Sequence, residues 1–243
     1  MLASQVIVRT LEGKVALITG GTGALGRAVS AAFVAAGARI VVTYVTEDKT
    51  PAFRAALPDG SCELAMVDLR SGSEIAGLVR RMLATRGRVD ALLNLAGGFW
   101  GGVPLVETPE AELDRLFAMN LKTAFLCAQA VVPAMVRQHA GSIVNVAARP
   151  ALAGGAGVSA YAIAKAGVVA LTRALADEVR EHGITVNAIA PSTIDTAANR
   201  AAMPQADPSR WVKPEEIAAT LVFLASDAAA ATSGAVIPIY GRS

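Results

Sequence analysis

The chain has 243 residues, of which 53% are apolar and 17% are charged, and its formal net charge is +2. A single core can grow to about 250 residues before chains tend to split, so we expect one α/β domain spanning residues 1–243. The 22 basic and 20 acidic residues are spread along the chain, which excludes the basic stripe of a nucleic-acid partner.

The first residues of the chain, its cysteines and its histidines bear on its compartment and on metal binding. The first residues, MLASQVIVRTLEGK, show no basic start followed by a sustained apolar stretch. No apolar run elsewhere reaches the roughly 18 residues that suggest a membrane span, so we expect a cytoplasmic protein without a membrane partner. Cys62 and Cys127 are expected to be buried free thiols in that reducing compartment. His139 and His182 are isolated, near predicted helix ends, and we expect no metal site.

Short β-branched segments alternate with longer amphipathic ones along the chain. The first strand is expected in KVALIT, the first helix in LGRAVSAAFVAAG and the second strand in RIVVTYV. Further strands are expected in CELAMV, DALLNLA, GSIVNVA, ITVNAIA and AVIPIY, and we expect about eight in all. Further helices are expected at 73–86, 109–138, 159–182 and 214–226. This alternation predicts a Rossmann-like, doubly wound parallel sheet with helices on both faces.

A glycine-rich turn, TGGTGALG, lies between the first predicted strand and the first predicted helix. Gly21, Gly23 and Gly26 have the GxGxxG spacing in the context that a dinucleotide site requires. Glycine lets the backbone approach a pyrophosphate, and the helix N-terminus offers unpaired amides and partial positive charge. A glycine-rich turn without a ligand is the alternative.

The end of the second predicted strand bears on the choice of coenzyme. An acidic residue there would hydrogen-bond the adenine ribose of NAD, but TYVT at 43–46 occupies these positions. No arginine or lysine stands there to bind a ribose phosphate, because Arg39 lies at the wrong end of the strand. We expect NAD(P)H with a preference for NADP(H), although Glu47 or Asp48 could still reach the ribose.

Tyr161 and Lys165 are four residues apart in the predicted helix 159–182, so their side chains share one helix face. A lysine ammonium beside a phenol stabilises the phenolate and lowers the pKa of the tyrosine from its usual value of about 10. That would suit proton transfer to or from a carbonyl or alcohol oxygen. The spacing alone is common by chance, and a structural tyrosine is the alternative.

Several motifs, in this order, resemble the short-chain dehydrogenase/reductase family over essentially the full length of the chain. They are TGGTGALG, Asp68 in MVDLR, NLAG at 94–97, Asn120 in MNLKTAF, YAIAK at 161–165 and NAIAPSTIDT at 187–196. The resemblance implies hydride exchange between a nicotinamide coenzyme and a small-molecule substrate. It also implies a homo-oligomer, a homodimer or homotetramer, which would associate through the long apolar helices.

The resemblance further assigns roles to individual residues. Tyr161 would be the catalytic acid or base, and Lys165 would hold the nicotinamide ribose and lower the pKa of the tyrosine. Asn120 would interrupt its helix and hold a water leading from Lys165 to solvent. The residues that the resemblance places at the coenzyme are Gly20, Thr22, Gly23, Ala24, Leu25, Gly26, Tyr44, Asp68, Leu69, Asn94, Ala96, Gly97, Tyr161, Lys165, Pro191, Ile194 and Thr196.

Three positions depart from the family's pattern. Ala24 stands where the middle glycine of the turn usually lies, and Ser192 replaces the glycine of APG. The catalytic serine expected after IVNV is absent, since Ala147 and Ala148 occupy its position. In the family it donates a hydrogen bond to the reacting oxygen, and losing such a donor costs about 10²- to 10³-fold in turnover when nothing replaces it. Ser159, expected at the helix N-cap and so open to an ordinary capping role, is the nearest hydroxyl.

One branch of the family, quinonoid dihydropteridine reductase, lacks this serine and keeps the tyrosine and lysine. The chain resembles that branch in GGTGALG and in NRAAMPQADPSRW at 199–211. The segment at about 197–213 is expected to be a short substrate lid, in which Met203, Pro204 and Trp211 could cover a flat ring. By contrast, VKPEEIAATLVFLAS and TSGAVIPIYG resemble ordinary bacterial reductases.

The sequence therefore predicts an NAD(P)H-dependent reductase of an activated carbonyl or a quinonoid pterin-like substrate. A conventional ketone or alcohol dehydrogenase that uses Ser159 is the first alternative. A non-catalytic NAD(P)-binding protein is the second.

Overall fold

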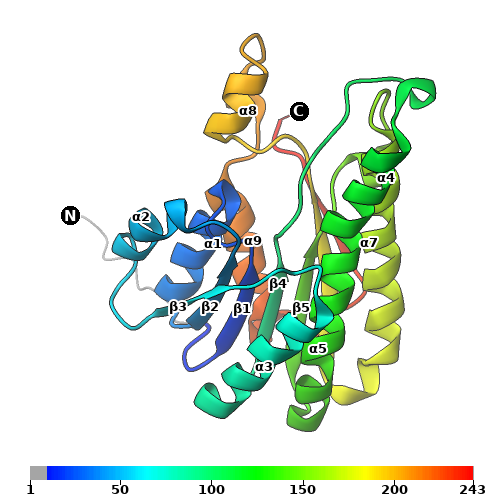
Figure 1. Ribbon diagram of the computed structural model, residues 1–243. Coiled ribbons are helices and arrows are strands. Elements are labelled where there is room, and N and C mark those ends of the chain that lie inside the picture. The colour runs from blue at the N-terminus through cyan, green and yellow to red at the C-terminus, as the bar shows by residue number, and fades with distance from the viewer. Residues whose placement is uncertain (1–9, 243) are drawn as a thin grey trace.

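The computed structural model describes residues 10–242, apart from the side chain of Lys49, and its centre is one parallel sheet (Figure 1). The strands lie in the order β3-β2-β1-β4-β5-β6-β7. The described residues thus hold seven strands, one in each of the seven segments named above, rather than the total of about eight expected. The strands are β1 Val15–Thr19, β2 Arg39–Tyr44, β3 Cys62–Met66, β4 Ala91–Asn94, β5 Gly141–Val146, β6 Ile184–Pro191 and β7 Val236–Ile239.

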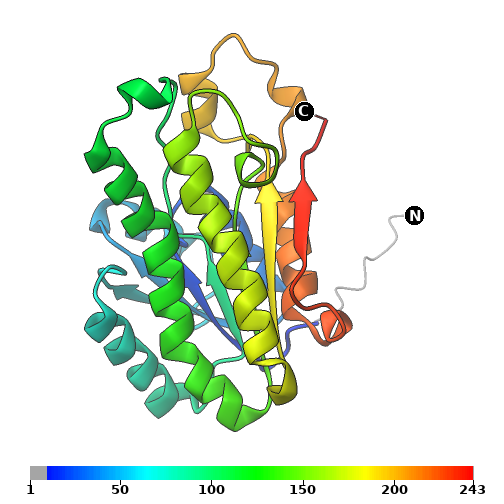
Figure 2. The same cartoon turned by 90° about the vertical axis from the view of Figure 1, so that its right-hand side faces the viewer.

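Helices cover both faces of the sheet, as the alternating sequence pattern predicts. Helices α1 (Ala24–Ala35) and α9 (Pro214–Ala225) cover one face, and α3 (Gly72–Arg86), α5 (Thr123–Gln138) and α7 (Ser159–Glu178) cover the other (Figure 2). In β1, Val15 and Leu17 pack on the α3 side, and Ala16 and Ile18 on the α1 side. Since side chains alternate between the faces of a strand, a sheet covered on both sides needs continuous apolar runs.

The remaining elements are short. They are the helices α2 Thr50–Ala55, α4 Glu110–Leu116, α6 Pro150–Ala153 and α8 Ala197–Ala202, the π-helical turn η3 Phe117–Lys122, and the 3₁₀ turns η1 Glu47–Lys49, η2 Leu105–Glu107, η4 Arg180–His182, η5 Pro208–Arg210 and η6 Asp227–Ala229. The helix expected at 159–182 therefore ends at Glu178 and is followed by a tighter turn. Both cysteines are free thiols, as expected, but only Cys127 is buried and Cys62 is half-buried.

The helix expected at 109–138 is continuous but changes its winding, because η3 separates α4 from α5. By length and composition this stretch, Glu110–Gln138, is apolar enough to cross a membrane, contrary to our reading of the sequence. Buried core helices pass the same test, and this stretch packs against α3, β4, β5 and α7. Its length alone is weak evidence for a membrane span.

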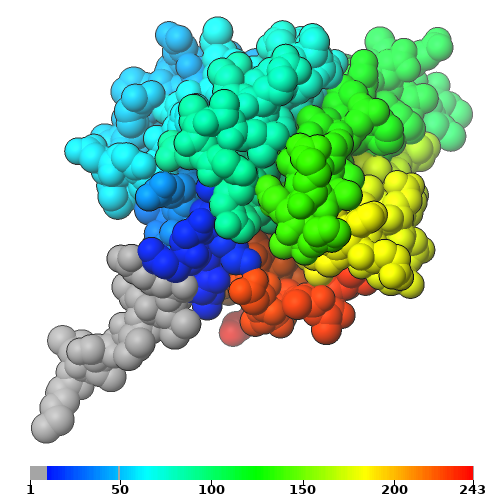
Figure 3. All heavy atoms as spheres, turned by 90° about the horizontal axis from the view of Figure 1, so that it is seen from below, coloured from blue at the N-terminus to red at the C-terminus, as the bar shows by residue number. Residues whose placement is uncertain are grey.

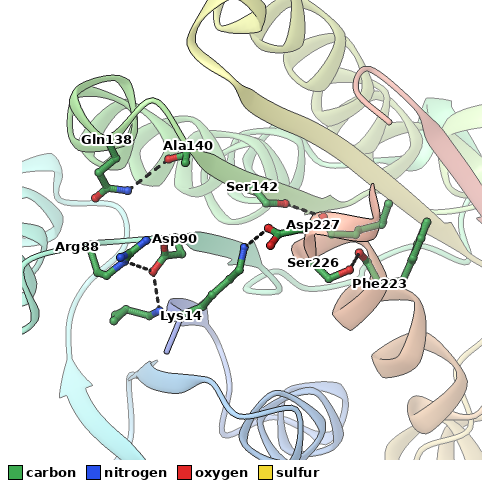
Figure 4. A network of polar contacts seen from close by, with 11 residues as sticks. Lys14, Arg88, Asp90, Gln138, Ala140, Ser142, Phe223, Ser226 and Asp227 are labelled. Atoms are coloured by element: carbon green, nitrogen blue, oxygen red, sulfur yellow. Dashed lines mark hydrogen bonds and ion pairs between the residues drawn. The ribbon is translucent and has the colours of Figure 1, made fainter. Parts of the chain in front are cut away.

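Polar contacts close the amino-terminal edge of the sheet (Figure 4), where the start of β1 and the segment after α9 lie side by side in the view from below (Figure 3). Lys14 pairs with Asp227 at 2.5 Å, and the buried Asp90 accepts the backbone N–H of Val15 at 2.8 Å while it pairs with Arg88. These contacts connect the start of β1 to the start of β4 and to η6, the turn that follows α9. The opposite, carboxyl-terminal edge carries the loops in which the predicted site residues lie.

Candidate active site

The turn between β1 and α1 needs glycine at positions 20, 21 and 26. Gly20 has a left-handed φ of 64°, and an added Cβ would lie 3.0 Å from the Cα of Ala96. A Cβ on Gly26 would lie 2.4 Å from the Cα of Gly21. Gly23 is less confined, because the nearest atom to its added Cβ is the carbonyl oxygen of Gly20 at 3.3 Å. Of the GxGxxG set, Gly21 and Gly26 are fixed by the packing of the protein itself.

The N-terminal end of α1 is open to a ligand. Its N-cap is Gly23, which has no side chain to cap the first amides, and Ala24 and Leu25 begin the helix. Ala24 is exposed, so the methyl group that departs from the family pattern lies on the surface of the turn. The first amides of a helix carry partial positive charge and bind anions. The turn therefore fits the pyrophosphate of a dinucleotide coenzyme, and Thr22 within the turn is buried.

The end of β2 presents no charged group to a coenzyme ribose. Thr43 is buried, and its hydroxyl accepts the backbone N–H of Gly20 at 3.2 Å, so this residue supports the glycine turn. Tyr44 ends the strand and is half-buried, and Val45 is exposed. Arg39 begins the strand, at the far edge of the sheet, as expected.

Asp68 follows β3 and forms an ion pair with Arg70, with 2.8 Å between Oδ2 and Nη2. The hydrogen bonds from Arg70 lower the pKa of this carboxyl to about 2. Asp68 is therefore ionised at neutral pH, beside the buried Leu69. The sequence did not indicate that Arg70 would engage this carboxylate.

A chain of buried amides runs behind the expected coenzyme site. Asn94, the last residue of β4, donates from Nδ2 to Oδ1 of Asn145 at 2.8 Å, and Asn145 donates to the hydroxyl of Thr172 at 2.9 Å. Oδ1 of Asn94 is buried and has no partner within the protein. Buried acceptors are nearly always hydrogen-bonded, so this atom fits a donor supplied by a ligand. Asn145 and Thr172 were missed, although an asparagine amid the apolar residues of a buried strand was a usable signal.

Asn120 is buried in the π-helical turn η3, which confirms that it interrupts its helix. Its Nδ2 donates to the carbonyl oxygens of Leu116 and Gly98, each at 3.0 Å, and its Oδ1 accepts the N–H of Gly98 at 3.2 Å. A Cβ on Gly97 would lie 2.5 Å from the same Oδ1, so glycine is needed there. Asn120 thus fixes the loop that follows β4. The water assigned to it stays a prediction.

Tyr161 and Lys165 lie in the first turns of α7, with Nζ of Lys165 6.0 Å from the centroid of the Tyr161 ring. Lys165 is buried and donates to the carbonyl oxygen of Val146 at 2.7 Å. Burial raises the pKa of Tyr161 to about 12 and lowers the pKa of Lys165 to about 8. The expected lowering of the tyrosine pKa is therefore wrong for this structure, because desolvation of the phenolate outweighs the charge of a lysine at this distance.

The two alanines after β5 differ in their surroundings. Ala147 packs in an apolar cluster with Val168, Val169 and Ala190. Ala148 is also buried, stands outside that cluster, and precedes the exposed Arg149. Of the two alanines, only Ala147 thus belongs to that apolar cluster.

Ser159 does not cap α7 as expected, because Val158 is the N-cap and Ser159 is the first helical residue. Its hydroxyl oxygen is buried and makes no hydrogen bond. Residues two apart on a helix do not face each other, so Ser159 and Tyr161 lie on different faces of α7.

Pro191 is the last residue of β6, and the loop that follows it is held by local hydrogen bonds. Asn199 donates from Nδ2 to the carbonyl oxygen of Ile194 at 2.8 Å, and the hydroxyl of Thr196 accepts the N–H of Asn199 at 3.1 Å. Thr196 is thereby the N-cap of α8. Ser192 donates to the carbonyl oxygen of Tyr240 at 2.9 Å, so the residue that replaces glycine joins this loop to the end of β7.

The expected lid stands above the carboxyl-terminal edge of the sheet, with α8 projecting from the body (Figure 1). Its two ends meet in a parallel bridge between Ile194 and Val212, and residues 201–207 between them are exposed. Trp211 is only 8% exposed and lies outside that free segment, and its contact with a substrate ring stays a prediction. Met203, which is 38% exposed, belongs to it.

Phe99 lies next to the predicted catalytic tyrosine, and sequence reasoning missed it. The centroids of the Phe99 and Tyr161 rings are 5.0 Å apart, and the planes meet at 77°. The signal was the stretch GGFWGG, in which two aromatic residues stand between pairs of glycines directly after a strand.

Most predicted site residues thus gather at one edge of the sheet, from the loops after β1, β4, β5 and β6 and from the start of α7. Tyr44 and Asp68 lie at the same edge, on the side of β2 and β3. Four features together fit a nicotinamide dinucleotide. They are the glycine turn, the open N-terminus of α1, the unpaired amide oxygen of Asn94, and the pair Tyr161 and Lys165.

Comparisons with known proteins agree with this geometry. Residues 21–241 match the family model described as Enoyl-(Acyl carrier protein) reductase. The chain is 34% identical to the 3-oxoacyl-[acyl-carrier-protein] reductase FabG of Thermotoga maritima, over 95% of this chain and 98% of that protein. It is 36% identical to the (2S)-[(R)-hydroxy(phenyl)methyl]succinyl-CoA dehydrogenase subunit BbsD of Thauera aromatica, over 95% and 96%.

A third relative supports the likeness in both sequence and structure. The levodione reductase of Leifsonia aquatica is 34% identical over 99% of this chain and 98% of its own. A crystal structure of levodione reductase superposes with a TM-score of 0.89 over 95% of this chain and 97% of that chain. The chain therefore belongs to the short-chain dehydrogenase/reductase family and is an NAD(P)H-dependent oxidoreductase.

Proposed function

We propose that this enzyme reduces an activated carbonyl or a quinonoid, pterin-like ring, with NADPH as its preferred coenzyme. The observation that carries the proposal is the buried alanine pair Ala147 and Ala148, where the family has a serine that contacts the reacting oxygen. A substrate that is already strongly electrophilic needs that hydrogen bond least. The coenzyme supplies the hydride when bound, and the residues of the chain orient the substrate and deliver the proton.

Tyr161 would deliver the proton to the oxygen or nitrogen that gains negative charge. The phenol, whose pKa burial raises to about 12, is protonated at neutral pH and can donate its proton. Lys165 would hold the ribose next to the nicotinamide, from a position set by its hydrogen bond to Val146. Asn120 would contribute by fixing the loop at Gly98, close to Tyr161.

A missing donor is the main difficulty for an ordinary ketone substrate. Donors to a developing oxyanion contribute about 10²- to 10³-fold to turnover. Ser159 is the available hydroxyl, yet it lies on a different face of α7 from Tyr161. An acceptor that delocalises the incoming charge over a conjugated ring loses less when this donor is missing. The geometry therefore supports the activated substrate over the simple ketone.

The coenzyme preference rests on the end of β2. Tyr44 and Val45 offer no carboxylate that would repel a ribose phosphate or bind a free ribose hydroxyl. The ionised Asp68 nearby is already paired with Arg70 and would lie at the adenine, with Leu69. These features favour NADPH.

One observation favours the alternative of a conventional ketone or alcohol dehydrogenase. The hydroxyl of Ser159 is buried without a hydrogen-bond partner, which is costly unless a ligand uses it. The non-catalytic binding protein is the weaker alternative, since Tyr161, Lys165 and Asn120 are all retained in the expected places.

Two substitutions distinguish these substrates. We would measure oxidation of NADPH with a quinonoid dihydropterin and with cyclohexanone, in the wild type, in Ser159→Ala and in Ala148→Ser. The proposal expects turnover of the pterin that survives Ser159→Ala, and a gain on cyclohexanone in Ala148→Ser. Efficient reduction of cyclohexanone by the wild type that collapses in Ser159→Ala would instead establish the conventional dehydrogenase. Tight binding of NADPH without turnover of either acceptor would establish the binding protein.

We further propose that the enzyme is a cytoplasmic homodimer or homotetramer. An apolar patch, formed by Phe117, Leu121 and Phe125 of the long helix and by Leu171 of α7, supports this assembly. Phe125 is 49% exposed on it. Sedimentation of the wild type and of Phe125→Glu would test the assembly, because a charge in that patch should shift the oligomer towards the monomer.

A further inference from the structure

We propose that Phe99 determines substrate specificity in this enzyme, by forming with Tyr161 an aromatic wall against which a flat, conjugated substrate ring stacks. This inference rests on the proposed function, since it names the residue that would recognise a planar acceptor. Phe99 is a specificity residue and takes no part in the transfer of hydride or proton.

The ring of Phe99 is both exposed and next to the reacting group. It is 63% exposed, although large apolar side chains are usually buried. Its centroid lies 5.0 Å from that of Tyr161, with the planes at 77°, which is the edge-to-face arrangement that aromatic pairs prefer. A substrate whose reacting atom meets the Tyr161 hydroxyl would lie beside this exposed ring.

The backbone on either side of Phe99 is fixed by hydrogen bonds. On one side, Asn120 holds both the N–H and the carbonyl oxygen of Gly98. On the other side, the N–H of Gly102 donates to the carbonyl oxygen of Gly157 at 2.8 Å, which joins the loop after β4 to the loop before α7. The segment that carries Phe99 is therefore held between two anchors.

The glycines around Phe99 bring these two loops into close contact. A Cβ on Gly101 would lie 2.8 Å from the carbonyl oxygen of Gly157, 3.0 Å from Cγ1 of Val158 and 3.3 Å from Cζ of Phe99. No side chain can therefore be added at Gly101 without moving its neighbours. The ring of Phe99 lies next to Gly101 and Tyr161, while most of its surface remains uncovered.

An apolar ring held in place and left exposed beside a proton donor is suited to stacking. A conjugated substrate ring would bury the exposed surface of Phe99 and gain the offset or edge contacts that aromatic rings prefer. A small acyclic acceptor with the same reactive group would gain little from it. We expect removal of the ring to weaken binding of a planar acceptor by about 10-fold, the usual scale of one aromatic contact.

The test compares two acceptors that share an adjacent pair of carbonyls, phenanthrenequinone as the planar one and diacetyl as the acyclic one. Steady-state constants with NADPH would be measured for the wild type, Phe99→Ala, Phe99→Leu and Phe99→Trp. We expect KM for phenanthrenequinone to rise about 10-fold in Phe99→Ala, to rise less in Phe99→Leu, and to stay near wild type in Phe99→Trp. KM for diacetyl should change less than about twofold.

Phe223→Ala serves as the matched control, because Phe223 is 46% exposed on α9, away from the site, and should leave both constants unchanged. An equal change for both acceptors in Phe99→Ala, or full activity in Phe99→Leu, would overturn the inference. Absence of turnover would count against the proposed function, and Phe99 would then be tested by binding. Quenching of protein fluorescence by phenanthrenequinone, in the presence of NADP⁺, should weaken in Phe99→Ala, and an unchanged affinity would overturn the role of Phe99.

Discussion

Nζ of Lys165 donates a hydrogen bond of 2.7 Å to the carbonyl oxygen of Val146, the last residue of β5. The lysine is thereby anchored to the sheet, directly before the alanine pair that replaces the family's serine. This hydrogen bond within the protein is enough to hold the ammonium group near Tyr161. The cost of this position is the burial of a charged group, which several measurable properties should reveal.

The stability of the protein should depend on pH through Lys165. Burial lowers its pKa in the folded protein to about 8 from the usual 10.5, so between these values the unfolded chain binds more protons. The free energy of unfolding should therefore rise with pH across this window, by an amount on the order of 1–3 kcal/mol. Urea unfolding at pH 8 and pH 10 measures this rise, which Lys165→Met should abolish and Lys122→Met, at an exposed lysine, should retain. An identical rise in Lys165→Met would contradict the assignment.

Removing the amide of Asn120 should loosen the loop at Gly98. Asn120→Ala leaves two carbonyl oxygens and one N–H without their partner, so we expect a loss of about 2–3 kcal/mol in unfolding free energy and a fall in turnover. Thermal unfolding and turnover measure both effects, and Gln129→Ala, at an exposed position on α5, is the control. A variant as stable as the wild type would show that these hydrogen bonds contribute nothing.

Two substitutions in the glycine turn should differ in how much they destabilise the protein. Gly26→Ala should overpack the turn against Gly21, destabilising the protein by about 1–3 kcal/mol and abolishing coenzyme binding. In Gly23→Ala the methyl group would meet only the carbonyl oxygen of Gly20, at 3.3 Å, so the variant should lose less stability than Gly26→Ala. Calorimetry and titration with NADPH would compare the two variants. Equal destabilisation in both would be inconsistent with the packing described here.

A carboxylate at the end of β2 should reverse the coenzyme preference. In Tyr44→Asp the new charge would repel the ribose phosphate of NADPH and accept hydrogen bonds from the free ribose hydroxyls of NADH. The ratio of kcat/KM for NADPH over that for NADH should fall by at least about 10-fold, or about 1.4 kcal/mol. Initial rates with both coenzymes measure this ratio, and a ratio that does not move would place the ribose elsewhere.

Much of the architecture could be predicted from the sequence because its signals are local and repeated. The strands at VALIT and RIVVTY follow from apolar runs, and the glycine turn follows from its place between strand and helix. The sheet and its helical faces were predicted correctly for the same reason. Asn120 was identified through the order of several motifs, and the structure adds the physical reason that it holds Gly98.

What the sequence did not reveal depends on contacts between distant segments. The pKa of Tyr161 is set by the burial of its phenol in the folded protein, which the four-residue spacing to Lys165 does not encode. The burial of Trp211, which the sequence placed in the expected lid, depends on contacts that the local pattern does not encode. Phe99 had no recognisable role until its loop was placed beside Tyr161.

We propose above all that Tyr161 donates the proton when NAD(P)H reduces an activated ring. The most direct test follows oxidation of NADH and of NADPH with quinonoid dihydropterin as acceptor, in the wild type and in Tyr161→Phe. We predict turnover above the uncatalysed rate in the wild type, faster with NADPH, and a loss of about 10²- to 10⁴-fold in Tyr161→Phe. Equal rates in the two proteins, or no turnover with either coenzyme, would contradict the claim.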